Sequence, residues 1–97
     1  KTHDLTHVEA ALERAHAYAQ AGAHGIFVPG LVQELWIRHL CQQSPIPVNV
    51  MISATSPSNS TLTECGVARI SYGPLPYAQL MDSLKQSSLR VLAGQPF

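Results

Sequence analysis

A ten-residue stretch, residues 21–30 (AGAHGIFVPG), constrains the fold of this chain more than any other. Gly22 can end a helix by adopting a positive φ, and the apolar run Ile26-Phe27-Val28 suits a short strand covered on both faces. Pro29-Gly30 then stops the strand where βα folds usually bind ligands. The pattern recurs at residues 47–52 (PVNVMI) and 66–74 (GVARISYGP), so we expect three strands separated by helices.

The alternation of strands and helices predicts an α/β fold. Strands joined through helices form a parallel sheet with right-handed crossovers, and near-continuous apolar strands are typical of a sheet covered on both faces. An open, flavodoxin-like sheet and a closed barrel both fit this pattern. Three strands alone leave two unpaired edges. We therefore expect further sequence, a partner chain, or both, to cover them.

Length and charge narrow the classes of function. The chain has 97 residues, with six Lys and Arg against six Asp and Glu. A complete βα barrel needs roughly 200 residues or more, so these residues would form only part of one. The balanced, sparse charge offers no basic surface to nucleic acid and no polybasic patch to a membrane. Cys41 and Cys65 lack metal or redox spacing, which indicates free thiols and a reducing cytoplasm.

Four segments carry helix signals. Thr6 and Glu9 have the spacing of a capping box, which predicts that the first helix begins at Thr6. A second helix is expected at about residues 32–43 and a third at about 61–65, after a polar loop over 53–60. The last is expected at about residues 76–92. The second helix should present Leu35, Trp36, His39 and Leu40 to the interior, and the last should carry a stripe of Leu80, Met81, Leu84, Ser88, Val91 and Leu92.

The three strand segments, taken in order, resemble the C-terminal part of the isocitrate lyase and phosphoenolpyruvate mutase superfamily. The likeness is to its mutase-like branch, whose members carry AGADGIFVPGL-like, PLPxNVM-like and GVARISYGP-like strands. The resemblance implies that residues 1–97 form one partial domain, the last three strands of a (β/α)8 TIM-type barrel with their helices. It also implies a lyase or phosphonomutase that acts on a small α-oxo acid, carboxylate or phosphonate by breaking or moving a C–C or P–C bond.

Asn49 is the strongest candidate for a binding residue. An amide inside a buried strand costs free energy unless it is hydrogen-bonded, so Asn49 needs a partner. In lyases of the superfamily, a matching asparagine faces the barrel mouth and helps bind the substrate carboxylate. The resemblance therefore makes Asn49 a substrate-binding residue. The alternative is an asparagine that ties two strand ends together.

Ser71, Tyr72 and Gly73 end the last strand. Loops after the final barrel strands often bind phosphate through backbone amides, which makes these residues candidates for substrate binding. The alternative is a strand-to-helix turn in which Gly73 supplies an unusual backbone angle and Pro74 starts the helix. Ser53, Thr55 and Ser56 follow the preceding strand and supply hydroxyl donors at the corresponding position.

Lys1 is the last candidate substrate-binding residue. Lys1-Thr2 corresponds to an Arg-Thr pair of the family, whose arginine holds the substrate's carboxylate or phosphonate. Lysine lacks the planar fork that binds a carboxylate with two hydrogen bonds. A second departure is Val28-Pro29, where the C–C lyases have Pro-Glu. Without that carboxylate, isocitrate-type and methylisocitrate-type substrates are disfavoured.

The family resemblance implies a Mg²⁺ cofactor, but the acidic residues of this chain fall on helices and not at strand ends. We therefore expect the metal ligands outside this segment, no metal site within it, and no activity from the segment alone. Two other functions stay open: a phosphate-binding barrel such as a phosphosugar isomerase, and a half-barrel assembly module without chemistry. The apolar stripe of the last helix and the open sheet edges predict a homo-oligomer.

Overall fold

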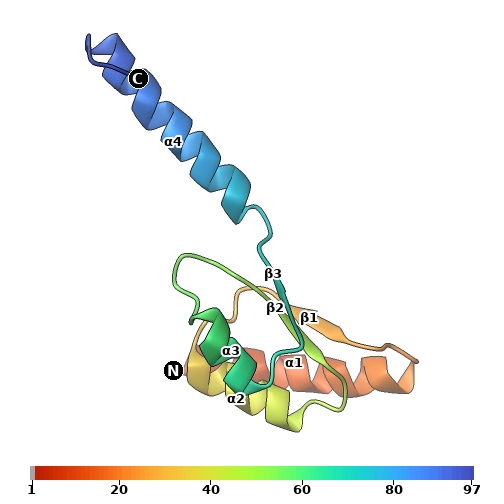
Figure 1. The fold of residues 1–97 in the computed structure, drawn as a ribbon. Helices are drawn as coiled ribbons and strands as arrows, with labels where there is room; N and C mark the ends of the chain where they lie inside the picture. Colours follow the sequence, from red (N-terminus) through yellow and green to blue (C-terminus); the bar gives the residue numbers. More distant parts are fainter. Residues whose placement is uncertain (1) are drawn as a thin grey trace.

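A computed structural model describes residues 2–97, with side chains described from Leu5 onward. Helices and strands alternate along the chain, as the sequence predicts (Figure 1). The elements are α1 (Thr2–Gln20), β1 (Ile26–Val28), α2 (Glu34–Gln43), β2 (Val48–Met51), α3 (Asn59–Cys65), β3 (Arg69–Ser71) and α4 (Leu75–Leu92).

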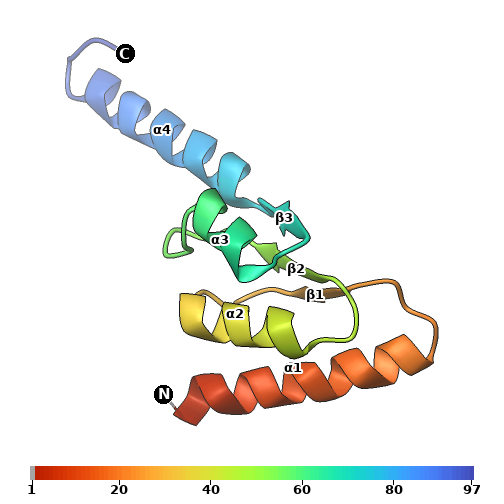
Figure 2. The same ribbon diagram turned by 60° about the horizontal axis from the view of Figure 1, so that its bottom comes forward.

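The three strands form a parallel sheet in the order β1-β2-β3. Because each right-handed crossover steps in the same direction, α2 and α3 lie on one face of the sheet, beside α1 (Figure 2). An open, doubly wound sheet would reverse its strand order and place helices on both faces. The one-directional order is that of a (β/α)8 barrel segment, in which every helix lies outside.

Side chains alternate across the sheet and divide it into a covered and an open face. Ile26, Val48 and Val50 are buried among the apolar side chains of α1, α2 and α3. Phe27 lies on the opposite face with 49% of its surface exposed, beside Asn49 in the next strand. The prediction that these strands are covered on both faces is therefore wrong for this chain. The helices cover one face, and no element among the described residues covers the other.

Two helices begin earlier than the sequence signals indicate. The first begins at Thr2, so Thr6 lies inside α1 and the capping-box prediction is wrong. The Thr6–Glu9 spacing does not mark a helix start inside α1, because a backbone N–H within a helix already donates to the carbonyl four residues back. The third begins at Asn59 because the hydroxyl of Ser58 accepts a hydrogen bond from the Thr61 amide at 3.2 Å and caps the helix.

The buried stripe of α2 also differs from the prediction. Ile37 and Leu40 are fully buried, whereas Leu35 is 67% exposed. Leu35 and Leu40 are five positions apart, which separates them by about 140° around the helix, so they cannot share a narrow stripe. Ile37 and Leu40 are three positions apart and do share one. Trp36 and His39 are partly buried and meet edge to face, with ring centroids 6.2 Å apart.

Helix α4 extends away from the rest of the molecule (Figure 1). Its predicted stripe is not covered by the strands of its own chain. Leu80, Met81, Leu84, Val91 and Leu92 are all exposed, as is Ser88. The chain's own sheet therefore does not bury this stripe. None of the helices within residues 2–97 combines the length and apolarity needed to cross a membrane.

The stripe of α2 gives a direct test of the fold. Ile37→Ala should lower the free energy of unfolding by about 2–5 kcal/mol, because it leaves a cavity in the core. Leu35→Ala, in the same helix, should change it by less than about 0.5 kcal/mol, because that side chain is mostly in water. Urea unfolding followed by circular dichroism measures both. Equal losses would contradict the orientation of α2.

Candidate functional site

The carboxyl ends of β2 and β3 are joined by a side-chain hydrogen bond. Asn59, the first residue of α3, donates from Nδ2 to the Tyr72 hydroxyl at 2.9 Å. Tyr72 follows β3, so this bond joins the two loops that leave the carboxyl ends of β2 and β3. The Tyr72 hydroxyl keeps its own proton, which it can donate to a further acceptor. We call Ser71, Tyr72, Gly73 and Asn59 the rim cluster.

Ser71 and Gly73 shape the turn beside this bond. The Gly73 amide donates to Ser71 Oγ at 3.2 Å. Gly73 has φ +50°, and a Cβ on it would lie 2.5 Å from the sulfur of Met51. A larger residue would therefore displace Met51 from the open face of the sheet. The turn requires this glycine whether or not the cluster binds a ligand.

The hydroxyls of the loop after β2 bond to one another. Ser56 Oγ accepts from the Ser53 amide at 2.8 Å and lies 3.3 Å from Ser53 Oγ. Thr55 Oγ1 is 3.4 Å from Ser53 Oγ. These contacts hold the loop in a defined turn. A ligand would meet hydroxyl groups that are already positioned, next to the rim cluster.

Asn49 lies away from the rim cluster. It is half-buried on the open face, and its Nδ2 is 3.4 Å from the position that a Cβ would take on Gly25. Gly25 precedes β1, so the amide leans toward the amino ends of the strands. No polar side-chain atom in the described part of the chain is buried without a partner. Lys1 lies outside the described residues.

A hollow of about 430 Å³ surrounds Asn49 at these amino ends. Arg69, His24 and Phe27 line it, together with Gly25, Pro47 and Ala68. The sequence analysis did not single out Arg69 as a candidate, although the alternation of a strand places it on the same face as Ser71. It also missed Asn59, whose partner Tyr72 is 13 positions away and invisible to local patterns.

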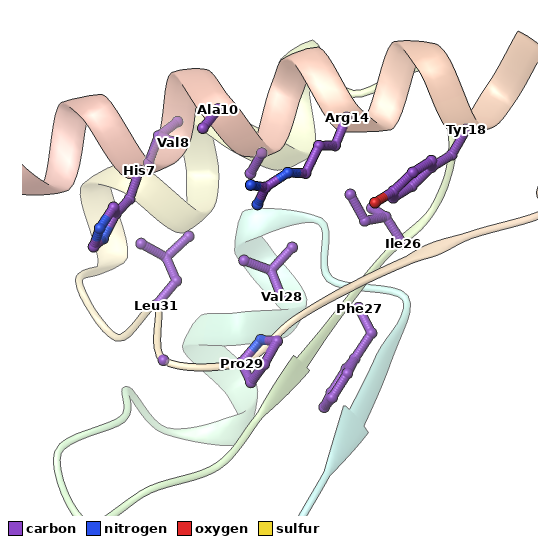
Figure 3. Close-up of a pocket in the computed structure, with 12 residues that line it drawn as sticks. His7, Val8, Ala10, Arg14, Tyr18, Ile26, Phe27, Val28, Pro29 and Leu31 are labelled. Carbon is purple, nitrogen blue, oxygen red and sulfur yellow. The ribbon is translucent and has the colours of Figure 1, made fainter.

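A second hollow, of about 580 Å³, runs between α1 and the unpaired edge of β1. Arg14 and Tyr18 reach from α1 toward the strand, and Phe27 points away from the helix (Figure 3). Pro29 also lines this hollow, at the position where the C–C lyases have Glu. Among the residues whose side chains the structure describes, none that lines this hollow is acidic.

The described residues bring no set of metal ligands together. No group of three or more His, Cys, Asp or Glu side chains within the described residues comes close enough together to hold an ion. The carboxylates lie on helices, as in the Glu34–Arg38 ion pair of α2, with a separation of 3.2 Å. These residues alone do not fit the Mg²⁺ that the family resemblance implies.

The two cysteines are free thiols in the packing of α2 against α3. Burial first, and the nearby Cys65 thiol second, raise the pKa of Cys41 to about 11. Burial also raises the pKa of Cys65. Both groups are protonated at neutral pH, so neither is an activated nucleophile.

Comparisons with known proteins give a consistent result. Residues 2–92 match the sequence model of a family described as phosphoenolpyruvate phosphomutase. Two uncharacterised proteins of Mycobacterium tuberculosis, from strains CDC 1551 / Oshkosh and ATCC 25618 / H37Rv, are each 36% identical over 84 residues. Each match covers 87% of this chain and 32% of the relative.

Two crystal structures from Burkholderia cenocepacia J2315 share the fold. A candidate phosphonomutase is 52% identical with a TM-score of 0.75, and the match covers 90% of this chain and 34% of that one. A candidate lyase or mutase is 24% identical with a TM-score of 0.78, covering 86% and 31%. The chain thus spans about a third of the length of these relatives.

The raised pKa of Cys41 predicts slow alkylation. Iodoacetamide reacts with the thiolate, so modification of Cys41 at pH 8 should be at least roughly tenfold slower in the folded chain than in urea. The folded-state rate should keep rising up to about pH 11, because the thiolate fraction grows until the pH passes the pKa. Mass spectrometry of the Cys41 peptide gives both rates. A folded-state rate that levels off near pH 9 would contradict the assignment.

Proposed function

Because this chain belongs to the phosphoenolpyruvate phosphomutase family, we propose that it supplies the last three strands of a (β/α)8 barrel enzyme acting on a small carboxylate or phosphonate. The observation that carries the proposal is the Asn59–Tyr72 hydrogen bond, which joins two loops at the carboxyl ends of neighbouring strands. Barrel enzymes build their active sites at that end. Family membership favours this function over a phosphosugar isomerase.

The rim cluster is suited to an anion. Tyr72 is 47% exposed, and its hydroxyl has accepted a hydrogen bond from Asn59, so its own proton is free for a carboxylate or phosphonate oxygen. Hydrogen bonds to charged groups contribute about 1.5–3 kcal/mol, more than those between neutral groups. In this proposal Tyr72 donates to the substrate, Asn59 holds the phenol in place, and Ser71 and Gly73 set the turn.

The reaction class follows from the family resemblance. It comprises breaking or moving a C–C or P–C bond of a small acid, with Mg²⁺ as cofactor. The described residues bring no metal ligands together, so the role proposed for this chain is confined to binding and positioning the substrate. Val28-Pro29 disfavours isocitrate-type substrates, which leaves phosphonates and other oxo acids. The free thiols fit a cytoplasmic location, which we also propose.

The rim cluster is tested by paired tyrosine variants in the natural full-length protein. Tyr72→Phe should lower kcat/KM for the preferred substrate about tenfold or more, because one hydrogen bond to a charged group is lost. Tyr77→Phe is the control, since Tyr77 lies on α4 outside the rim cluster and phenylalanine keeps its apolar ring. Steady-state assays with phosphonopyruvate, other 2-oxo acids and isocitrate identify the substrate. Equal effects of the two variants would contradict the binding role, and no turnover of any of these acids would contradict the function.

We also propose that the enzyme is a homo-oligomer in which α4 packs against a second copy. The helix presents large apolar side chains along its length and reaches beyond the body of its own chain (Figure 1). Exposed apolar area of this kind is typical of a protein–protein contact. A second copy offers the same stripe, so two α4 helices can cover each other.

Charge placed on the stripe tests this assembly. Leu84→Asp should shift the protein to a smaller species or to aggregates in light scattering, because a carboxylate in an apolar contact must be desolvated. Gln86→Asp adds the same charge two positions away, outside the stripe, and should leave the mass unchanged. A monomeric unsubstituted protein would contradict the proposal, as would identical masses for all three.

A further inference from the structure

Arg69 and Asn49 occupy neighbouring positions on the open face of the sheet. The register of β2 and β3 pairs the two residues directly, so their side chains leave the sheet on the same side. Both line the hollow of about 430 Å³ at the amino ends of the strands. The rim cluster lies at the opposite ends, so the two places are distinct.

The Arg69 guanidinium is not engaged by the chain. Arg38 pairs with Glu34 at 3.2 Å, and Arg90 donates to Ser87 Oγ at 2.7 Å. Among the side chains described from Leu5 onward, none makes a comparable hydrogen bond or ion pair with Arg69, and no acidic one lines its hollow. A guanidinium carries five donors and no acceptor, so its donors face solvent.

In a closed barrel, Arg69 needs a negatively charged partner, which it does not need in the isolated chain. The face of a barrel sheet that is turned away from the helices points inward, and Arg69 lies on that face. A buried charge costs several kcal/mol unless it is paired and hydrogen-bonded. His24 and Asn49 provide no negative charge. The counter-ion must therefore come from outside these residues.

The donor set identifies the kind of counter-ion. The planar guanidinium matches a carboxylate with two parallel hydrogen bonds. The Asn49 amide adds N–H donors from the adjacent strand, and Gly25 leaves it room because no Cβ stands there. We propose that Arg69 and Asn49 together bind one carboxylate group inside the barrel. This inference rests on the barrel of the proposed function, but not on the rim cluster or on any reaction.

The carboxylate has two sources, a small acid or an acidic side chain of another barrel strand. The natural full-length protein tests the shared chemistry. In its NMR spectra, the Arg69 Nε–H and Asn49 side-chain N–H signals should be displaced from those of an exposed guanidinium and amide, either already without added ligand or saturably with acetate and not with chloride at equal ionic strength. Arg38 is the internal reference. Arg69→Met should abolish the Asn49 shift, Arg69→Lys should weaken it, and Arg38→Met should leave it intact. Equal shifts at Arg38 and Arg69 would overturn the proposal.

The natural full-length protein distinguishes the sources. An acidic side chain would keep the Arg69 signal in its bound position without acetate and release it as the pH falls through the pKa of that carboxyl. A small acid would leave the signal responsive to acetate at neutral pH. An Arg69 signal that changes neither with falling pH nor with added acetate would overturn the proposal. If Tyr72→Phe leaves kcat/KM unchanged while the Arg69 and Asn49 NMR shifts are observed, the binding role of the rim cluster is rejected and this inference is not.

Discussion

The structure depends on one constraint, the common direction of its crossovers. Because parallel crossovers are right-handed and both steps move the same way, α2 and α3 collect on one face of the sheet, where α1 packs against α2 and β1. Ile26, Val48 and Val50 are buried on that side, and the alternate residues Phe27 and Asn49 face the other. The open face is therefore a product of topology, and it is where a barrel would have its interior.

Local signals in the sequence predicted the strands well. The Gly and Pro residues that flank residues 26–28 mark the bounds of β1, and Gly66 ends α3 with φ +102°. Helix starts and buried faces were predicted less well. The capping-box spacing at Thr6 also occurs inside a helix, and the face that α2 turns inward is fixed by packing against distant segments. Cover on both faces of the sheet was predicted from the apolar strands, but no described residue covers the face of Phe27 and Asn49.

The residues of the candidate site also divide into those that local sequence indicates and those that only distant contacts bring together. Ser71, Tyr72 and Gly73 were singled out as candidates because they follow a strand, and strand ends can be read locally. Asn59 and Arg69 were not singled out, because the contacts that make them candidates depend on neighbours in other elements. Asn59 meets Tyr72 through a loop closure, and Arg69 meets Asn49 only through the register of two strands. Asn49 was singled out from sequence, but only the structure shows which end of the sheet its amide approaches.

In the proposed barrel, the β1 edge of this sheet pairs with another strand. The Ile26 amide donates to the Pro47 carbonyl at 2.9 Å, so the Phe27 amide, one residue on, points away from β2. Hydrogen exchange of the Phe27 amide in the natural full-length protein measures whether that strand is present. Protection comparable to that of Val50 in the central strand is predicted, because a neighbouring strand would accept its proton. Exchange as fast as that of an unpaired loop amide would contradict the barrel.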